Sequence, residues 1–318
     1  MRIIGTGSAA PGLRVQNHEL SSFLNTSDEW IRTRTGILER RILTTEPLEA
    51  LAAEAAEKAL KQAGLSAAQV DYILCSNVIN PYLTPALSCV IQGEIGATCP
   101  CLDINGACAG FLYALEMAEA YLKSGKCRHI LVVAAECPTR MVDWADRATC
   151  VLFGDGAAAA VVSAEGEDAC FRMYTACNTD VLHAYNASGN CPYVSPQIPA
   201  SPLSMNGQEV YKFAVSRATE DIKALCEAQG MKLCEIGHFL LHQANLRILE
   251  AVRMRLGQPR EKFPHNVEAH GNTSSAGVAI LLDELNHSGA LQKGEYLALS
   301  AFGAGLTSAA CILKWDLP

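Results

Sequence analysis

The sequence predicts an α/β fold in which two similar halves, residues 1–165 and 166–318, pack into one body. Three observations lead to this prediction. Helical and strand-like segments alternate along the chain, which is typical of α/β proteins. Segments such as 130–134 and 158–162 are apolar throughout, as expected of strands covered by helices on both faces. A set of landmarks also recurs in the same order in both parts of the chain.

Each half is predicted to run through helix, strand, helix, strand and strand. The first landmark is a helix ending at a glycine, and the second is an apolar strand. The third is a turn of small residues leading into a helix that ends in Ser-Gly. The fourth is a Phe-Gly-x-Gly turn entering an apolar strand. In order, the landmarks occupy residues 54–64 and 220–230, 70–75 and 237–242, 108–125 and 272–289, and 153–156 and 302–305.

The spacing of the third landmark favours duplication. Cys108 precedes Gly125 by 17 residues, and Asn272 precedes Gly289 by the same number. The alternative is that such coincidences arise in any α/β chain, but the shared order argues against it. If Cys108 and Asn272 occupy equivalent places, pseudo-twofold packing brings both helix starts to one central cavity. His242 then reaches that cavity from the end of a nearby strand.

Composition limits the classes of function. The chain has 318 residues, 50% of them hydrophobic, and a net charge of −8, which argues against general nucleic-acid binding but leaves room for a small basic patch. The 14 cysteines are scattered through apolar segments, as expected of free thiols in a reducing compartment. No signal peptide and no membrane-spanning run is recognisable, so we expect a cytoplasmic protein that does not insert into membranes.

Cys108 is the first candidate for chemistry. It follows a strand and a tight turn of small residues, and a helix is expected to begin at about this position. A thiol at a helix N-terminus faces unsatisfied N–H groups and the positive end of the helix dipole. We therefore expect a lowered pKa and a nucleophilic thiolate, with small neighbours that let a thioester approach. The alternative is a buried structural cysteine, which fits most of the other thirteen.

His242 and Asn272 are the second and third candidates. His242 directly follows an apolar strand, at the end where α/β proteins place ligands, although a single histidine is more often structural. Asn272 begins a run of Asn, Thr and Ser that also fits ordinary helix capping. The turn at 301–305 offers backbone N–H groups that can form an oxyanion hole with the N–H of Cys108. A plain tight turn is the alternative.

Together these segments closely resemble β-ketoacyl-acyl-carrier-protein synthase III, of the thiolase-like superfamily. The resemblance covers essentially the whole chain and depends on many ordered matches. It implies a thiolase-like α/β fold with two duplicated halves in a five-layered αβαβα body. The matching segments are 26–37, 107–111, 146–147, 153–156, 205–207, 242–247, 271–275 and 302–305.

The resemblance also implies an activity. The chain is expected to be an acyltransferase that joins an acyl-CoA primer to malonyl-acyl-carrier protein by decarboxylative Claisen condensation. Cys108, His242 and Asn272 correspond to the catalytic triad, and the backbone N–H groups of Cys108 and Ala304 to the oxyanion hole. No metal or redox cofactor is implied, and a homodimer is expected. The positions corresponding to the coenzyme A or phosphopantetheine contacts are Trp30, Arg34, Arg147, Gly207, Tyr211 and Asn245.

Two further surfaces are predicted with alternatives left open. Basic residues concentrate in an otherwise acidic chain and suggest a docking patch for an acidic carrier protein, or simply a solvated helix face. By resemblance, Leu83 or Thr84 borders the acyl pocket, partly from the neighbouring subunit, and a small Thr84 leaves room for a longer or branched primer. The residues of the predicted docking patch are Lys212, Arg247, Arg253 and Arg255.

Other functions fit parts of the same sequence. A related enzyme of secondary metabolism would keep the triad and transfer the acyl group to another nucleophile. A non-catalytic partner subunit would only hold a carrier protein, and the intact triad argues against it. The glycines at positions 5 and 7 loosely match a dinucleotide fingerprint, but Pro11 and Gly12 interrupt the helix that such a site requires. Cys99 and Cys101 lack a second pair of zinc ligands.

Overall fold

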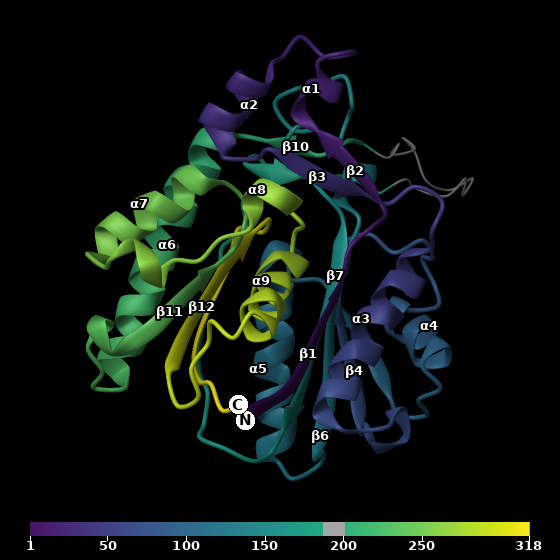
Figure 1. Ribbon diagram of the computed structural model, residues 1–318, viewed down its shortest axis with the longest axis vertical. Helices are drawn as coiled ribbons and strands as arrows, with labels where there is room; N and C mark the ends of the chain where they lie inside the picture. Colours follow the sequence, from purple (N-terminus) through teal and green to yellow (C-terminus); the bar gives the residue numbers. More distant parts are fainter. Residues whose placement is uncertain (187–200, 318) are drawn as a thin grey trace.

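The computed structural model describes residues 1–186 and 201–317. Two sheets lie side by side, with helices between them and on both outer faces (Figure 1). The first sheet has the order β1-β7-β6-β4-β5 and the second has the order β11-β12-β13-β8. The first sheet comprises β1 (Arg2–Ala9), β4 (Tyr72–Ser76), β5 (Cys101–Ile104), β6 (His129–Glu136) and β7 (Gly156–Ser163). The second comprises β8 (Cys170–Thr175), β11 (Ile236–Leu241), β12 (Tyr296–Gly303) and β13 (Thr307–Lys314).

The two sheets share one pattern of strand directions. In the first sheet β4 is parallel to β6, β6 is antiparallel to β7, and β7 is antiparallel to β1. In the second, β11 is parallel to β12, β12 is antiparallel to β13, and β13 is antiparallel to β8. The series β4-β6-β7-β1 and β11-β12-β13-β8 therefore match strand for strand. Strand β5 adds a fifth strand to the first sheet, and neither β5 nor β1 is predicted by the recurring landmarks.

The layers explain why the central strands are apolar on both faces. Ile130 and Val132 of β6 point into a core that lies between the two sheets, whereas Leu131 and Val133 join a core on the outer face. The inner core holds α5 (Gly110–Lys123) and α9 (Ala276–His287), which carry apolar residues around most of their circumference. The outer layers are α3 (Leu48–Ala63) with α4 (Leu87–Glu94), and α6 (Gly207–Ala228) with α7 (Leu246–Leu256).

Small residues let α3 pack closely against the first sheet. A Cβ atom on Gly5 or Gly7 of β1 would lie about 2.2 and 2.3 Å from the carbonyl oxygens of Ala59 and Ala55. Only glycine fits such an approach, because any side chain would collide with the helix backbone. Both glycines lie within strand β1, where they allow this close packing of α3.

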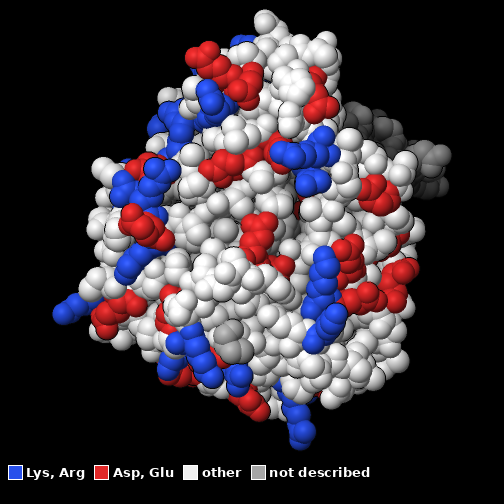
Figure 2. All heavy atoms as spheres, in the orientation of Figure 1, with Lys and Arg blue, Asp and Glu red and all other residues white. Residues whose placement is uncertain are grey.

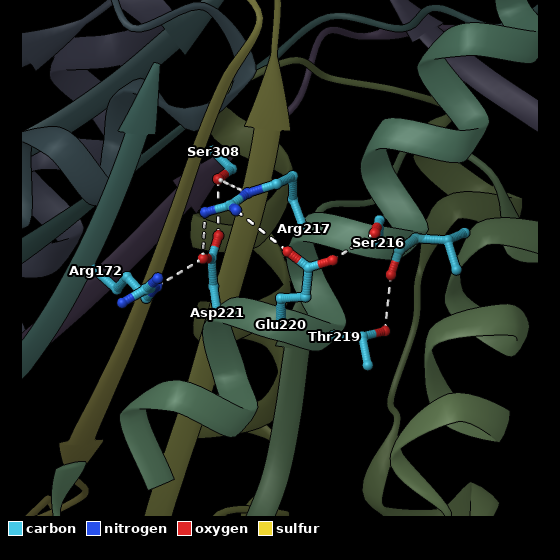
Figure 3. A network of polar contacts seen from close by, with 8 residues as sticks. Arg172, Ser216, Arg217, Thr219, Glu220, Asp221 and Ser308 are labelled. Carbon is cyan, nitrogen blue, oxygen red and sulfur yellow. Dashed lines mark hydrogen bonds and ion pairs between the residues drawn. The ribbon is translucent and has the colours of Figure 1, made fainter. Parts of the chain in front are cut away.

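A polar network fixes α6 on the second sheet (Figure 3). Asp221 of α6 is fully buried and accepts hydrogen bonds from Arg217 at 2.6 Å and Ser308 at 2.7 Å. Arg172 of β8 donates to the same carboxylate at 3.0 Å. A buried carboxylate needs such partners, and removing one side of a buried ion pair typically costs about 3–5 kcal/mol. The network thus joins α6 to β8 and β13.

Shorter elements cap the end of the molecule above the sheets (Figure 1). Gly36 ends α2 in a left-handed conformation, with φ of 82°. A Cβ atom there would lie 2.6 Å from Leu246, so glycine lets α2 approach α7. None of the helices in the described ranges is both long and apolar enough to cross a bilayer. The remaining elements are β2 (Leu13–Gln16), β3 (Glu39–Ile42), β9 (Leu182–His183), β10 (Ser204–Met205), α1 (Asn17–Leu20), α2 (Asp28–Thr35) and α8 (Val267–His270).

Candidate active site

One cavity of about 350 Å³ contains Cys108, His242 and Asn272. Cys108 lies between β5 and α5, His242 directly follows β11, and Asn272 lies in the segment between α8 and α9. The cavity therefore draws on both sequence halves. The side chains that the sequence pattern predicts to meet do share one compartment, whereas their chemical roles remain predictions.

The backbone around Cys108 differs in detail from the predicted helix start. Residues Ala107–Ala109 form a 3₁₀ turn, and the α-helix begins at Gly110. Ala107 has a φ of 47°, a left-handed conformation that is costly for a residue with a Cβ atom. Ser274, whose hydroxyl lies beside the Cys108 sulfur, is also left-handed, with φ of 52°. In the described ranges these are the only two non-glycine residues with positive φ, and both line the cavity.

The expectation of a lowered pKa at Cys108 is wrong for this protein. Burial raises the pKa of its thiol to about 12, and the negative charge of Glu136 acts in the same direction. The hydroxyl of Ser274, 3.4 Å from the sulfur, opposes this shift only in part. Because no lysine, arginine or histidine contributes to the shift, the thiol needs another means of losing its proton.

His242 is held as a neutral ring. It is 2% exposed, and burial lowers its pKa to about 4. Its backbone N–H donates to the carbonyl of Ser300 on β12 at 2.7 Å, and its ring meets Phe302 edge-on, with centroids 5.0 Å apart. Its Nδ1 atom is buried without a hydrogen-bond partner in the described part of the chain. A neutral imidazole has one N–H to donate.

Asn272 is fixed by both its backbone and its side chain. Its N–H donates to the carbonyl of Leu152 at 2.8 Å, and its carbonyl accepts from Gly154 at 3.1 Å. Its side-chain oxygen accepts from the N–H of Ser274 at 2.9 Å. This bond orients the amide, so its NH₂ group remains as a donor toward the cavity that Asn272 lines.

The turn after β12 closes the cavity beside Cys108. A Cβ atom on Gly303 would lie 2.6 Å from the backbone nitrogen of Cys108, so the two chain segments touch at this point. Ala304 follows directly and also lines the cavity. The backbone geometry thus brings together the two segments whose N–H groups are predicted to form an oxyanion hole.

Two polar residues beside Cys108 are absent from the sequence predictions. Glu136 ends β6, is 1% exposed, and is linked to Cys108 through Ser274. The signal that indicates His242, a polar residue at the carboxyl end of an apolar strand, applies equally to Glu136. Ser274 carries no such signal, since the run of Asn, Thr and Ser reads as helix capping.

The predicted coenzyme A contacts form two groups. Gly207, Tyr211 and Asn245 line the cavity itself. Outside it, the guanidinium groups of Arg34 and Arg147 lie over the ring of Trp30, with 4.6 and 4.9 Å to the centroid. The side chain of Asn245 donates to the carbonyl of Arg34 at 3.1 Å, which ties the two groups together.

Basic side chains gather near α2 and α7, interspersed with acidic ones (Figure 2). Lys212 pairs with Glu209 at 2.7 Å, and Arg253 pairs with Glu250. Arg247 and Arg255 are exposed and have no ion pair within the described residues. The four predicted docking residues thus comprise two whose charge is already paired and two whose charge is not.

The predicted acyl-pocket residues lie elsewhere. Leu83 is 99% exposed, Thr84 is also exposed, and neither lines the cavity of its own chain. Val78, Met141 and Phe302 are among the apolar residues that do line it. A contribution of Leu83 or Thr84 to an acyl pocket therefore requires a second subunit.

The fold and the cavity define an enzyme of the thiolase-like class. The protein-family model of 3-oxoacyl-[acyl-carrier-protein] synthase III matches residues 102–180 of the sequence. The family model of the C-terminal part of the same enzyme matches residues 226–315. The chain is 40% identical to a β-ketoacyl-[acyl-carrier-protein] synthase III of Clostridium perfringens, over 98% of both chains. The chain belongs to the β-ketoacyl-acyl-carrier-protein synthase III family, whose members are acyltransferases.

Solved structures agree with this assignment. A 3-oxoacyl-[acyl-carrier-protein] synthase III of Aquifex aeolicus superimposes with a TM-score of 0.92 at 38% identity, covering 99% of each chain. The priming β-ketosynthase of the R1128 polyketide pathway superimposes with a TM-score of 0.91 at 36% identity, covering 100% of this chain and 96% of the other. The predicted thiolase-like, five-layered αβαβα body is confirmed.

Across residues 1–186 and 201–317, no group of three or more His, Cys, Asp or Glu side chains is placed to hold a metal ion.

Proposed function

We propose that this protein condenses an acyl-CoA primer with malonyl-acyl-carrier protein to give a β-ketoacyl-carrier protein, the step that initiates fatty-acid synthesis. The observation that carries the proposal is the shared cavity of Cys108, His242 and Asn272. Full-length relatives at 40% identity bear the name of that activity.

The first half-reaction transfers the acyl group to Cys108. Its sulfur attacks the thioester carbonyl, and the backbone N–H groups of Cys108 and Ala304 stabilise the tetrahedral oxyanion. The contact between Gly303 and the Cys108 backbone supports this pairing of donors. Coenzyme A leaves, and the acyl group remains on the sulfur.

The second half-reaction forms the carbon–carbon bond. His242 and Asn272 donate hydrogen bonds to the malonyl thioester carbonyl while loss of carbon dioxide generates an enolate. Both groups are fitted to donate, because the imidazole is neutral and the Asn272 amide is oriented by Ser274. Each donor in a dry site stabilises the developing charge by about 3 kcal/mol. The carbanion then attacks acyl-Cys108.

The substrate arm runs from the cavity to the surface around Trp30. Gly207, Tyr211 and Asn245 contact the phosphopantetheine portion, and the aromatic ring with its two guanidinium groups contacts the nucleotide end of coenzyme A. Planar guanidinium groups on an aromatic ring offer both stacking surface and positive charge for phosphates. Replacing Trp30 with alanine should raise the KM for acyl-CoA more than it lowers kcat.

The exposed arginines of α7 dock the acidic carrier protein. Arg247 and Arg255 carry this role, and Lys212 and Arg253 contribute less because their charges are paired. Reversing Arg247 and Arg255 should weaken use of the carrier-bound thioester more than use of malonyl-CoA. Lys223→Glu, at an exposed position of α6, is the matched control. Equal losses with both thioesters would remove the docking role.

The active form is a homodimer. Strand β5 forms the edge of the first sheet, and Leu102 on it is 39% exposed, so the edge is available for pairing. Leu83 and Thr84 then border the acyl pocket of the partner subunit. Sedimentation at micromolar concentration tests the assembly. A panel of acyl-CoA primers tests the size of the acyl pocket. A much higher rate with acetyl-CoA than with C6 to C10 primers would contradict the prediction that the small Thr84 leaves room for a longer chain.

The decisive experiment offers acyl-CoA primers and malonyl-carrier protein and follows both products. Mass spectrometry should find the acyl group on the Cys108 peptide, and Cys108→Ser should abolish it. Acylation of a different cysteine would refute the assignment. The likeness to a polyketide-priming ketosynthase keeps acyl transfer to another nucleophile as the second candidate. A nucleophile screen separates the two, and failure to decarboxylate malonyl thioester would favour a non-catalytic subunit.

A further inference from the structure

A chain of hydrogen bonds runs inward from Cys108 to Glu136. The hydroxyl of Ser274 lies 3.4 Å from the Cys108 sulfur and 3.2 Å from the Glu136 carboxylate. Glu136 also accepts from the Ser275 hydroxyl at 2.5 Å and from the backbone N–H of Val78 at 3.1 Å. The donors to the carboxylate come from two separate parts of the chain, Val78 and the pair Ser274 and Ser275, so the carboxylate is held firmly in place.

No cation among the described residues pairs with this carboxylate. Glu136 has no ion pair within residues 1–186 and 201–317, and hydroxyl and N–H donors are its only partners there. The titratable groups that respond to its charge are the thiols of Cys75 on β4, Cys108 before α5 and Cys137 after β6. Burial raises the pKa of Glu136 to about 7, so it can take up and release a proton near neutral pH.

The hydroxyl between the two groups is suited to relay a proton. Serine has a single hydrogen to donate, together with lone pairs that accept. When that hydrogen points to the Glu136 carboxylate, a lone pair of Ser274 faces the thiol of Cys108. One concerted shift along this line turns the thiol into a thiolate and the carboxylate into a carboxylic acid. Glu136 is buried and does not line the cavity, whereas Ser274 does, so Glu136 acts through Ser274 as a positioning residue that stores a proton.

We propose that Glu136 accepts the thiol proton of Cys108 through Ser274 during acylation and returns it when the β-ketoacyl product departs. This inference rests on the proposed role of Cys108 as nucleophile. It supplies what the site otherwise lacks, since burial lowers the pKa of His242 to about 4 and so makes its ring a weaker base than Glu136, and no cation among the described residues contributes to the pKa of the Cys108 thiol. The substrate class stays the same, and the new element is the path of the proton.

The proton and charge balance over a full cycle. In acylation the S–H bond of Cys108 breaks, an S–C bond to the acyl carbon forms, and the proton moves to Glu136. Coenzyme A leaves as a thiolate and takes a proton from water. In condensation the malonyl carboxylate leaves as carbon dioxide, and its electron pair forms the new C–C bond. The Cys108 sulfur departs as a thiolate and recovers the stored proton, so one proton from water is consumed per turnover.

Neutralising Glu136 also helps the second half-reaction. While the acyl group is on Cys108, the carboxyl beside it carries the proton and has no charge. A malonyl carboxylate and its enolate then enter a cavity without a neighbouring anion, which avoids a like-charge repulsion that is strong at low dielectric. A carboxylate that stayed ionised would oppose that step.

In the competing view Glu136 acts only through its negative charge. The two views predict opposite changes in the reactivity of Cys108 when Glu136 is replaced with glutamine. As a fixed anion, Glu136 raises the pKa of Cys108, so Glu136→Gln would make the thiol more acidic and more reactive. As a proton acceptor, Glu136 makes the thiol reactive once the carboxyl is ionised, so the same variant makes it less reactive. Ser274→Ala separates them further, because it retains the charge and removes the relay.

The test follows alkylation of Cys108 by iodoacetamide as a function of pH, read from the mass of the Cys108 peptide. In the wild-type protein the rate should rise near pH 7 to a plateau. Glu136→Gln and Ser274→Ala should both lack this rise and react about 10²-fold more slowly at pH 8. Glu57→Gln, at an exposed position of α3, is the matched control and should behave as wild type. Circular dichroism checks that each variant is folded.

The outcomes separate this proposal from the proposed function. Faster alkylation of Glu136→Gln, or an unchanged profile of Ser274→Ala, overturns the relay. Acyl-CoA single turnovers on the same variants should show the same loss at pH 8. If wild-type Cys108 shows the rise near pH 7 but takes no acyl group from acyl-CoA, the proposed function fails while the relay stands. If Cys108 is acylated but its alkylation shows no such rise, the relay fails alone.

Discussion

Replacing Glu136 with glutamine should stabilise the folded protein above neutral pH. The carboxyl has a pKa of about 4.5 when exposed, as in the unfolded chain, and of about 7 in the folded protein. Between these values the folded state binds the proton more tightly, so stability falls as pH rises through this window. Below pH 4.5 the penalty is absent, and above pH 7 it is fully present, at about 3 kcal/mol.

Urea unfolding at about pH 5 and pH 8 measures this penalty. Glutamine has nearly the same shape and can keep the bonds from Val78 and Ser275 by its carbonyl oxygen. The variant should therefore gain about 3 kcal/mol over wild type at pH 8 and about 1 kcal/mol at pH 5. Protein concentration must be matched, because assembly contributes to apparent stability.

Glu57→Gln serves as the control, because its side chain is exposed and its removal should leave both urea midpoints unchanged. An equal stability of Glu136→Gln and wild type at pH 8 would refute the reasoning. So would a stability difference that grows toward low pH, because that sign belongs to a carboxylate stabilised in its charged form. Either result would mean that the hydrogen bonds to Glu136 offset its burial, and that its pKa lies near or below the ordinary value of about 4.5 instead of near 7.

Three further changes have separate consequences. His242→Gln should leave acylation of Cys108 intact and slow condensation by about 10²- to 10³-fold in a carrier-protein assay. Because burial lowers the pKa of His242 to about 4, the imidazole should stay neutral between about pH 5 and 9, and its protonation should not slow wild-type condensation in this range. A loss of condensation rate centred near pH 6.5 that is absent from His242→Gln would contradict a neutral ring. Arg247→Glu should lower kcat/KM for malonyl-carrier protein about tenfold at low salt and much less at high salt. Asp221→Asn should destabilise the fold by about 3 kcal/mol in urea, since Arg172 and Arg217 lose their buried partner.

The layers of the fold follow from patterns that are local in sequence. The apolar strands, the helix-ending glycines and the common spacing after Cys108 and Asn272 all predict two matched sheets. Both Gly125 and Gly289 indeed have positive φ, about 70°, which is the reason for glycine at those helix ends. Strand β5 is predicted only as the strand before the turn at Cys108, and its place in the sheet, which residue order does not reveal, is fixed by pairing with β4.

The electrostatics of the site could not be predicted in the same way. The expected low pKa of Cys108 came from its place near a helix start, which is visible in sequence. The actual shift comes from desolvation and from Glu136, which lies 28 residues away in the chain and approaches through Ser274. Such contacts depend on tertiary packing, so residue order alone does not reveal them.

Burial acts in a consistent direction on three titratable groups, two that line the cavity and Glu136 beside it. It favours the neutral thiol of Cys108 and the neutral ring of His242, and it brings Glu136 close to neutrality at physiological pH. A cavity with so little fixed charge lets the N–H donors act at full strength on an oxyanion or an enolate. The same exclusion of water raises the pKa of the Cys108 thiol, so the thiol needs a base within hydrogen-bond reach to lose its proton. Glu136, joined to the sulfur by a single hydroxyl, is the group in the described chain that satisfies this requirement.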